Sequence, residues 1–372
     1  MEDNSNNFNN TGDIDNTNDI NNTNDINNAN DINNTNDINN TNDITIGTNY
    51  IKHLFSKIGF CYVAYFGITI AAQLLISFIL ANNFVESLMQ NFKNILLITF
   101  IISEITMYAI AFPIFLLMMK KIPRVSLPKN KLTAKNLLII LIMAFGIMMT
   151  GNLISIAIEA LVGRINNTEV TNSLESILKD IPLSFTILMT AVLAPIFEEL
   201  LFRKILIDRC VQFGELNAII LSGIIFGLFH MNISQFFYAT ALGMIFAWVY
   251  IRTGNILYTM FLHFCINTVG GVIPSIFMRL GSTNSTDFST MSPIDIVSSV
   301  YTILQVVIAI IGVTLFIVKR KNMLVDPTTP VIDKKNMKLT YSNAGITTYI
   351  IMCIIIMIID LLSRAGFISL GF

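Results

Sequence analysis

Long apolar runs follow one another along this sequence after residue 57, and they restrict the folds open to it. A helix needs about 20 predominantly apolar residues, within a range of about 17 to 25, to cross the hydrocarbon core of a bilayer. We therefore predict an all-α fold, a polytopic transmembrane helical bundle with nine spans, or eight if one span is re-entrant. The predicted spans are 58–80, 95–119, 137–161, 182–202, 217–231, 235–251, 255–278, 297–318 and 346–362.

The scarcity of charge supports the same prediction. The 372-residue chain is 53% hydrophobic but only 13% charged, whereas about a quarter of the residues in a typical soluble domain are charged. The missing charge, more than the apolar content, indicates a membrane protein.

Lysine and arginine gather in two of the predicted loops. Residues 120–136 (KKIPRVSLPKNKLTAKN) and 319–345 each hold six of them. Cytoplasmic loops of membrane proteins carry an excess of these residues. With nine spans both loops fall on one side, which predicts a cytoplasmic N-terminus and a C-terminus on the opposite side.

The N-terminal region has a different composition, because the hexapeptide DINNTN and close variants recur from Asp13 to Asn42. A short regular period can indicate a β-helix or solenoid. Each repeat, however, offers a single isoleucine, so there is little apolar surface to offset the entropy of ordering the chain. We predict a disordered, Asn-rich tail over residues 1–50.

The stretch FEELLFR, residues 197–203, places three charges at the end of an apolar run. A charge at the bilayer centre costs about 2.5–3.5 kcal/mol on insertion scales, so such residues are candidates for a functional site. Glu199 and Arg203 are four residues apart and can pair along one helix face. Glu198 is offset by about 100° and stays free to face a cavity. Alternatively, Glu199 and Arg203 form only an interfacial ion pair.

Two histidines lie in later apolar runs, within FGLFH (residues 226–230) and HFCIN (residues 263–267). The spacing of four residues places Phe226 on the same helix face as His230, and His263 on the same face as Asn267. These residues also have purely structural interpretations. Phe226 can pack in the core, His230 can lie where a helix ends, and His263 with Asn267 can form hydrogen bonds between helices.

Three further acidic residues, Glu104, Glu159 and Asp360, fall in predicted spans. They come singly, without the partners that the three motifs offer. The motifs lie within about 70 residues on neighbouring predicted helices. We therefore predict that their polar side chains converge on one site.

EELLFR, FGLFH and HFCIN match, in this order, the signatures EExxxR, FxxxH and HxxxN. On these motifs the chain resembles the CPBP family of intramembrane proteases, also called Abi proteins, which includes CAAX prenyl proteases and bacterial proteins linked to bacteriocin processing or self-immunity. The resemblance covers roughly residues 180–275. The domain organisation that we expect is the tail (1–50), N-terminal transmembrane helices (51–175), a CPBP/CAAX-protease-like catalytic core (176–278) and C-terminal transmembrane helices (279–372).

The resemblance implies a role for each motif residue. It implies that Glu198 is the catalytic carboxylate, that His230 is its partner on the attacking water, and that His263 and Asn267 stabilise the oxyanion. The supporting residues that it implies are Glu199 and Arg203, as a structural pair, and Phe226, in the wall of the site.

These side-chain types suit amide hydrolysis, which needs a base, donors to the oxyanion and a proton for the leaving amine. Glu198, His230 and His263 also form a carboxylate-plus-two-histidine set that zinc accepts. The chain has no HExxH motif, however, and asparagine is a better hydrogen-bond donor than metal ligand. We predict a hydrolase that acts in proteolysis without a metal or other cofactor.

The expected partners are the lipid bilayer and a hydrophobic or lipidated peptide substrate, with no nucleic acid. By analogy with the family we expect a bacterial plasma membrane and a role in bacteriocin or peptide maturation or self-immunity. One alternative is a non-catalytic scaffold or immunity protein. An ion-coupled transporter is another, which the lack of internal symmetry between the halves disfavours.

Overall fold

The computed structural model describes residues 41–80, 95–168, 170, 181–282, 290–320 and 334–368. The chain divides into two units, Met1–His53 and Leu54–Phe372, and the second unit contains all the motifs. Most of the predicted Asn-rich tail, residues 1–40, lies outside the described residues. Helix α2 (Thr41–Leu80) begins before the predicted end of the tail at residue 50.

The described residues form helices and the connections between them, and no strand occurs among them. Within the described ranges, eight helical stretches are long and apolar enough to cross a membrane, which confirms the predicted polytopic bundle. The ninth predicted run, 217–231, forms a shorter apolar helix, Glu215–Phe229. The eight stretches are Gly47–Ile76, Phe100–Met119, Ala134–Asn166, Leu183–Phe213, Ile233–Thr253, Ile256–Arg279, Pro293–Lys319 and Ala344–Arg364.

Several of these stretches combine α-helical and π-helical segments. In chain order, the elements after α2 that concern the site and its surroundings are α4 (Ile95–Ile105), η2 (Thr106–Ala111), α5 (Phe112–Met119), α6 (Ala134–Asn166), α8 (Leu183–Thr186), η3 (Ile187–Leu193), α9 (Ala194–Glu199), η4 (Leu200–Ile205), α10 (Leu206–Cys210), α11 (Glu215–Phe229), α12 (Ile233–Thr253), α13 (Ile256–Asn267), η6 (Thr268–Val272), α14 (Ile273–Arg279), α15 (Pro293–Lys319), α16 (Lys334–Tyr341) and α17 (Ala344–Arg364). The segments labelled η2, η3, η4 and η6 are π-helical.

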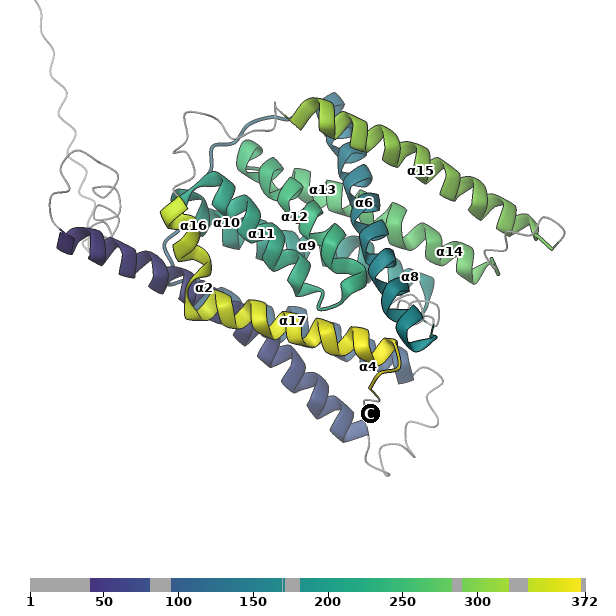
Figure 1. The fold of residues 1–372 in the computed structure, drawn as a ribbon, viewed down its shortest axis with the longest axis horizontal. Helices are drawn as coiled ribbons and strands as arrows, with labels where there is room; N and C mark the ends of the chain where they lie inside the picture. The colour runs from purple at the N-terminus through teal and green to yellow at the C-terminus, as the bar shows by residue number, and fades with distance from the viewer. Residues whose placement is uncertain are drawn as a thin grey trace, which may run out of the picture. The chain divides into compact units, whose positions relative to one another are not determined.

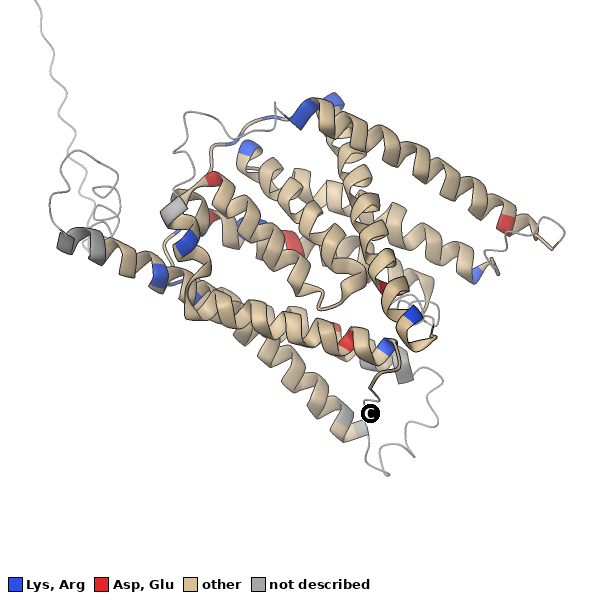
Figure 2. Cartoon of the chain, viewed as in Figure 1, with Lys and Arg blue, Asp and Glu red and all other residues tan. Residues whose placement is uncertain are grey.

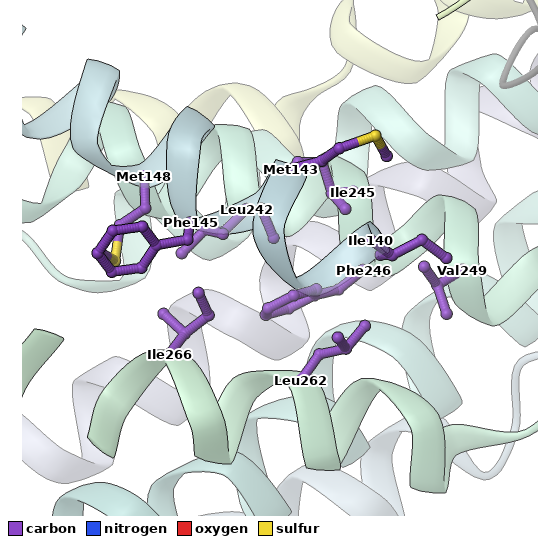
Figure 3. Packing of buried hydrophobic residues seen from close by; sticks show 11 residues of the cluster. Ile140, Met143, Phe145, Met148, Leu242, Ile245, Phe246, Val249, Leu262 and Ile266 are labelled. Carbon is purple, nitrogen blue, oxygen red and sulfur yellow. The ribbon is translucent and has the colours of Figure 1, made fainter. Parts of the chain in front are cut away.

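Helix α12 is central to the second unit, where it packs against α6 and α11, and α6 in turn packs against α15 (Figure 1). A buried apolar cluster joins α6, α12 and α13, and Phe246 lies in it between Ile140 and Leu262 (Figure 3). Lipid tails are as apolar as leucine, so close packing rather than escape from water holds such helices together. This cluster fixes α13, which carries HFCIN, against α12.

Close packing of α11 on α12 depends on glycine. A Cβ atom at Gly227 would lie 1.9 Å from the Thr240 hydroxyl oxygen and 2.8 Å from the Phe236 carbonyl oxygen. Small residues allow helix backbones to approach closely inside membranes. Gly227 therefore keeps α11, and with it FGLFH, tight against α12.

The stretch that contains EELLFR continues to Phe213, beyond the predicted end of the run at residue 202. Charged residues lower the hydropathy there, but they have partners in the fold. Lys204 pairs with Asp208 at 2.7 Å, and Arg209 donates to the Met119 carbonyl oxygen at 3.0 and 3.1 Å. Along the described helices, Lys, Arg, Asp and Glu are sparse (Figure 2).

Candidate active site

Glu198 and Glu199 lie at the end of α9, a short helical segment between two π-helical segments. The first of these is η3, which precedes α9, and the second is η4, which follows it and contains Arg203. A π-helical turn widens the backbone and occurs often at functional sites. The backbone irregularity of this stretch is therefore concentrated around the two carboxylates.

Glu199 contacts Arg203 and His263 and hydrogen-bonds with Thr259, and all three side chains are buried. Its Oε2 lies 3.1 Å from Arg203 Nε, and both side chains are fully buried, so the predicted pairing along the helix is present. Its Oε1 lies 2.9 Å from His263 Nδ1. Sequence spacing did not reveal this second contact, because it joins residues 64 positions apart on α9 and α13.

The other ring nitrogen of His263 faces Glu198, with 3.5 Å between Nε2 and Oε2. His263 thus lies between the two adjacent carboxylates, with Glu199 held by Arg203 and Glu198 at the longer distance. The 2.9 Å contact orients the imidazole, since a short hydrogen bond at Nδ1 fixes the direction of Nε2. We call Glu198, Glu199, Arg203 and His263 the motif cluster.

Phe226 packs among the charged and imidazole groups of the site. Its ring centroid lies 4.5 Å from the Arg203 guanidinium carbon, 5.2 Å from the His230 ring and 5.7 Å from the His263 ring. A guanidinium over an aromatic face is attracted by the ring quadrupole, more strongly when both are away from water. Phe226 thereby links the EExxxR motif to both histidines.

Phe246 of α12 covers the cluster from a second side. Its ring lies 5.5 Å from the His263 ring and 5.5 Å from the Arg203 guanidinium carbon. Because Phe246 also belongs to the apolar core, it connects that core directly to the site. The sequence contained no signal for this role, since Phe246 lies outside the three motifs.

A tight turn positions His230 between α11 and α12. Met231 adopts a left-handed conformation with φ of 51°, which is uncommon for a residue other than glycine. Asn232 then caps α12 through its side-chain oxygen, which accepts from Gln235 N at 2.9 Å, and its Nδ2 donates to the His230 carbonyl oxygen at 2.7 Å. The turn therefore holds the His230 backbone firmly beside the Phe226 ring.

Asn267 lies at the end of α13, four residues after His263. Its Nδ2 donates to the Thr190 carbonyl oxygen at 2.8 Å, and Thr190 lies in the π-helical segment η3. An asparagine amide has two N–H donors, so one contact with Thr190 orients the group and leaves a second donor. Thr190 was missed because a backbone carbonyl has no sequence signature.

The prediction that the remaining intramembrane acids lack partners is wrong. Arg364 Nη1 lies 3.0 Å from Glu159 Oε1, and Arg364 Nη2 lies 2.9 Å from Asp360 Oδ2. The Ser234 hydroxyl also donates to Glu159. We call Glu159, Ser234, Asp360 and Arg364 the Glu159 cluster. Its main ion pair joins residues 205 positions apart, beyond the reach of any spacing argument.

Glu104 likewise has a partner, since the Tyr108 hydroxyl hydrogen-bonds its carboxylate one turn away. Within the described part of the chain, no group of three or more His, Cys, Asp or Glu side chains has an arrangement suited to a metal ion. The motif residues contact one another through hydrogen bonds, ion pairs and ring contacts.

The fold is a polytopic helical bundle, and its candidate site holds two adjacent carboxylates beside an imidazole. Comparison with known proteins places this combination among membrane peptidases. Residues 180–269 match the family described as "Type II CAAX prenyl endopeptidase Rce1-like". Over 102 residues the chain is 31% identical to "Putative membrane peptidase YdiL" of Bacillus subtilis (strain 168). That match spans 27% of this chain and 41% of the relative.

No solved structure matches the chain. The family match and the bacterial relative agree with the resemblance to the CPBP family of membrane proteases that the three motifs indicate. The segment contains all three motifs, from Glu198 to Asn267.

Proposed function

We propose that this protein is a glutamate-type intramembrane endopeptidase of the CPBP/CAAX type. The observation that carries the proposal is the position of His263 between Glu198 and Glu199, at 3.5 and 2.9 Å. The ring contacts of Phe226 with both histidines bring the second motif to the same place. The match to a family of membrane endopeptidases supports the same conclusion.

In the proposed reaction, Glu198 accepts a proton from a water molecule that His230 orients. The resulting hydroxide attacks the carbonyl carbon of the scissile peptide bond and forms a tetrahedral oxyanion. Glu198 then gives the proton to the leaving nitrogen as the C–N bond breaks, so that an amine and a carboxylic acid are released, and the acid then loses its remaining proton to water. A positioned acid–base group of this kind typically contributes about 10²–10⁴-fold to the rate.

Two side chains stabilise the oxyanion in this scheme. Asn267 offers the amide N–H that is not directed at Thr190, and His263 offers Nε2, for which the ring must carry a proton there. One such donor is worth about 2.7–4 kcal/mol in the best-studied proteases. Glu199 positions the imidazole and does not itself contact the substrate, while Arg203 holds Glu199.

The proposed substrate is a peptide with a hydrophobic or lipidated segment, because only such a peptide reaches residues within apolar helices. The family includes proteins linked to bacteriocin processing, so peptide maturation or self-immunity in a bacterial plasma membrane is the proposed role. The basic loop 120–136, which follows the second membrane-crossing stretch, supports a cytoplasmic N-terminus. This part of the proposal rests on analogy with the family.

The test is peptide cleavage by the purified full chain in liposomes, with a library of hydrophobic and prenylated peptides. Wild type, Glu198→Gln and chelator-treated wild type are compared. We expect cleavage by the wild type, undiminished by the chelator and lost in Glu198→Gln. Loss under chelation would instead establish metal-dependent catalysis. Cleavage of no peptide, with an immunity phenotype that survives Glu198→Gln in cells, would favour a non-catalytic scaffold.

A further inference from the structure

A cavity of about 230 Å³ lies between the end of α5 and the stretch formed by η4 and α10. It is separate from the motif residues, none of which lines it. Its volume is several times the share of about 30 Å³ that one water molecule has in the liquid. The charged side chains that line it are Lys120, Arg124, Lys204, Asp208 and Arg209.

The positive charges of the cavity exceed its negative charge even after internal pairing. Asp208 is occupied, since Lys204 Nζ lies 2.7 Å from its Oδ2 and the Tyr250 hydroxyl donates to its Oδ1 at 2.7 Å. This pairing offsets the charges of Lys204 and Asp208 and leaves Lys120, Arg124 and Arg209.

Arg209 presents a fixed positive charge to the cavity. Its Nε and Nη2 donate to the Met119 carbonyl oxygen, at 3.1 and 3.0 Å, and its Nη1 donates to the Ile205 carbonyl oxygen at 2.8 Å. Backbone carbonyls hold the group in place but do not neutralise it. Arg124 lies close enough to Arg209 for their like charges to interact, an arrangement that an anion between them would stabilise.

The segment that carries Arg124 is attached to the helices behind it. Val125 N donates to the Asp208 carbonyl oxygen at 2.7 Å, and further along the segment Asn130 N donates to the Thr253 carbonyl oxygen at 2.9 Å. Arg124 therefore extends from a held backbone beside the cavity.

Apolar side chains border the same cavity on the α5 side. Leu116 and Leu117 line it and are 40% and 68% exposed, and they lie near the end of the membrane-crossing stretch Phe100–Met119. The site thus presents exposed apolar surface followed by basic groups. A lipid with acyl chains and an anionic headgroup has the same order, and basic pockets between membrane helices bind such headgroups.

We propose that this cavity binds the headgroup phosphate of an anionic glycerophospholipid, with the acyl chains against Leu116 and Leu117. Lys120, Arg124 and Arg209 contact the phosphate. The bound lipid joins the end of α5 to α10, on the helical stretch that carries Glu198 and Glu199. This proposal does not depend on the peptidase activity.

The experiment is native mass spectrometry of the purified full chain in neutral detergent, titrated with phosphatidylglycerol, phosphatidylcholine or inorganic phosphate. The test variant is Lys120→Gln/Arg124→Gln. The matched control, Lys129→Gln/Lys131→Gln, removes the same charge from exposed residues of the same loop that do not line the cavity. At about fivefold per basic residue, we expect phosphatidylglycerol to bind about 25-fold more weakly to the test variant and equally to wild type and control.

Several results would overturn the proposal. An equal loss in the control would mean general surface attraction, and equal binding of phosphatidylcholine would mean that the headgroup charge is not recognised. Inorganic phosphate that displaces the lipid at equal concentration would assign the cavity to a free anion. Displacement by a hydrophobic peptide through its terminal carboxylate would assign it to the substrate. If the double variant unfolds, Arg124→Gln alone repeats the test with an expected loss of about fivefold.

Discussion

The motif cluster is a buried group of acidic and basic side chains, and the Glu159 cluster is a partly buried one, but their charges are paired differently. In the Glu159 cluster, Arg364 contacts Glu159 at 3.0 Å and Asp360 at 2.9 Å. In the motif cluster, Arg203 contacts Glu199 at 3.1 Å, whereas Glu198 faces the His263 imidazole at 3.5 Å. An acidic side chain inside a membrane helix therefore does not by itself mark a reactive site.

This difference in pairing indicates that the Glu159 cluster stabilises the fold, whereas the motif cluster can take part in catalysis. A carboxylate held against a guanidinium joins two helices, as Glu159 on α6 and Arg364 on α17 do. A carboxylate that shares an imidazole with a second carboxylate has a partner able to exchange a proton. We therefore expect substitutions in the Glu159 cluster to change stability, and substitutions at Glu198 to change catalysis.

The largest expected effect on stability follows Glu199→Ala. Removing this carboxylate leaves Arg203 buried and unpaired, which typically costs about 3–5 kcal/mol, and it also releases His263 Nδ1. The matched variant Glu159→Ala costs less, because Arg364 keeps Asp360 as a partner. Thermal unfolding of both variants in one detergent measures the difference. An equal destabilisation of the two would contradict the distinction between the clusters.

Asn267→Ala should chiefly affect catalysis. Loss of an oxyanion donor lowers kcat by about 10²–10³-fold, while loss of the hydrogen bond to the Thr190 carbonyl costs about 1 kcal/mol of stability. Steady-state cleavage and thermal unfolding measured on the same sample separate the two effects. Activity within twofold of the wild type would remove Asn267 from the proposed mechanism.

Gly227→Val tests whether α11 must lie close to α12 for His230 to be positioned. The added methyl groups meet Thr240 and the Phe236 carbonyl, so we expect a loss of about 1–3 kcal/mol, as for other overpacked interiors. Gly67→Ala is the control, because its Cβ would meet nothing within 4 Å. In a helix the alanine is favoured over glycine by about 1 kcal/mol. A Gly227→Val protein as stable as the wild type would show that the two helices tolerate separation.

The smallest effect should follow Asp360→Asn. The Asp360 side chain is 31% exposed, and exposed ion pairs contribute about 0.2–1 kcal/mol. Arg364 retains Glu159, so the α6–α17 contact persists and peptide cleavage stays at the wild-type rate. A loss of cleavage in Asp360→Asn, measured under the same conditions, would extend the reactive region to the Glu159 cluster.

The features of the fold that local sequence determines were predictable. Hydropathy and helical spacing predicted the bundle and the Glu199–Arg203 pair, because both depend on residues within a few helical turns. The order of the three motifs also indicated the family resemblance, which the comparisons support. The sequence placed the end of the EELLFR stretch at residue 202, whereas the helical stretch continues to Phe213. A hydropathy profile does not show the partners that Lys204 and Arg209 find in the fold.

Most of the missed contacts join distant parts of the chain, although Asp360–Arg364 and Glu104–Tyr108 are each only four residues apart. The Glu199–His263 bond, the Asn267–Thr190 bond and the Glu159–Arg364 pair join residues 64, 77 and 205 positions apart. Helical spacing predicts which side chains share a face, but not which helix lies opposite. The π-helical segments beside Glu198 and Glu199 were missed for a related reason, because tertiary packing overrides local helix geometry.

The central claim is that the motif cluster performs chemistry while the Glu159 cluster provides stability. The most direct measurement compares Glu198→Gln with Glu159→Gln in liposomes, recording peptide cleavage and thermal unfolding for each. We predict that Glu198→Gln loses cleavage by about 10²–10⁴-fold and unfolds at nearly the wild-type temperature, whereas Glu159→Gln keeps cleavage and unfolds at a lower temperature. Cleavage that survives Glu198→Gln, or that falls equally in both variants, would contradict this account.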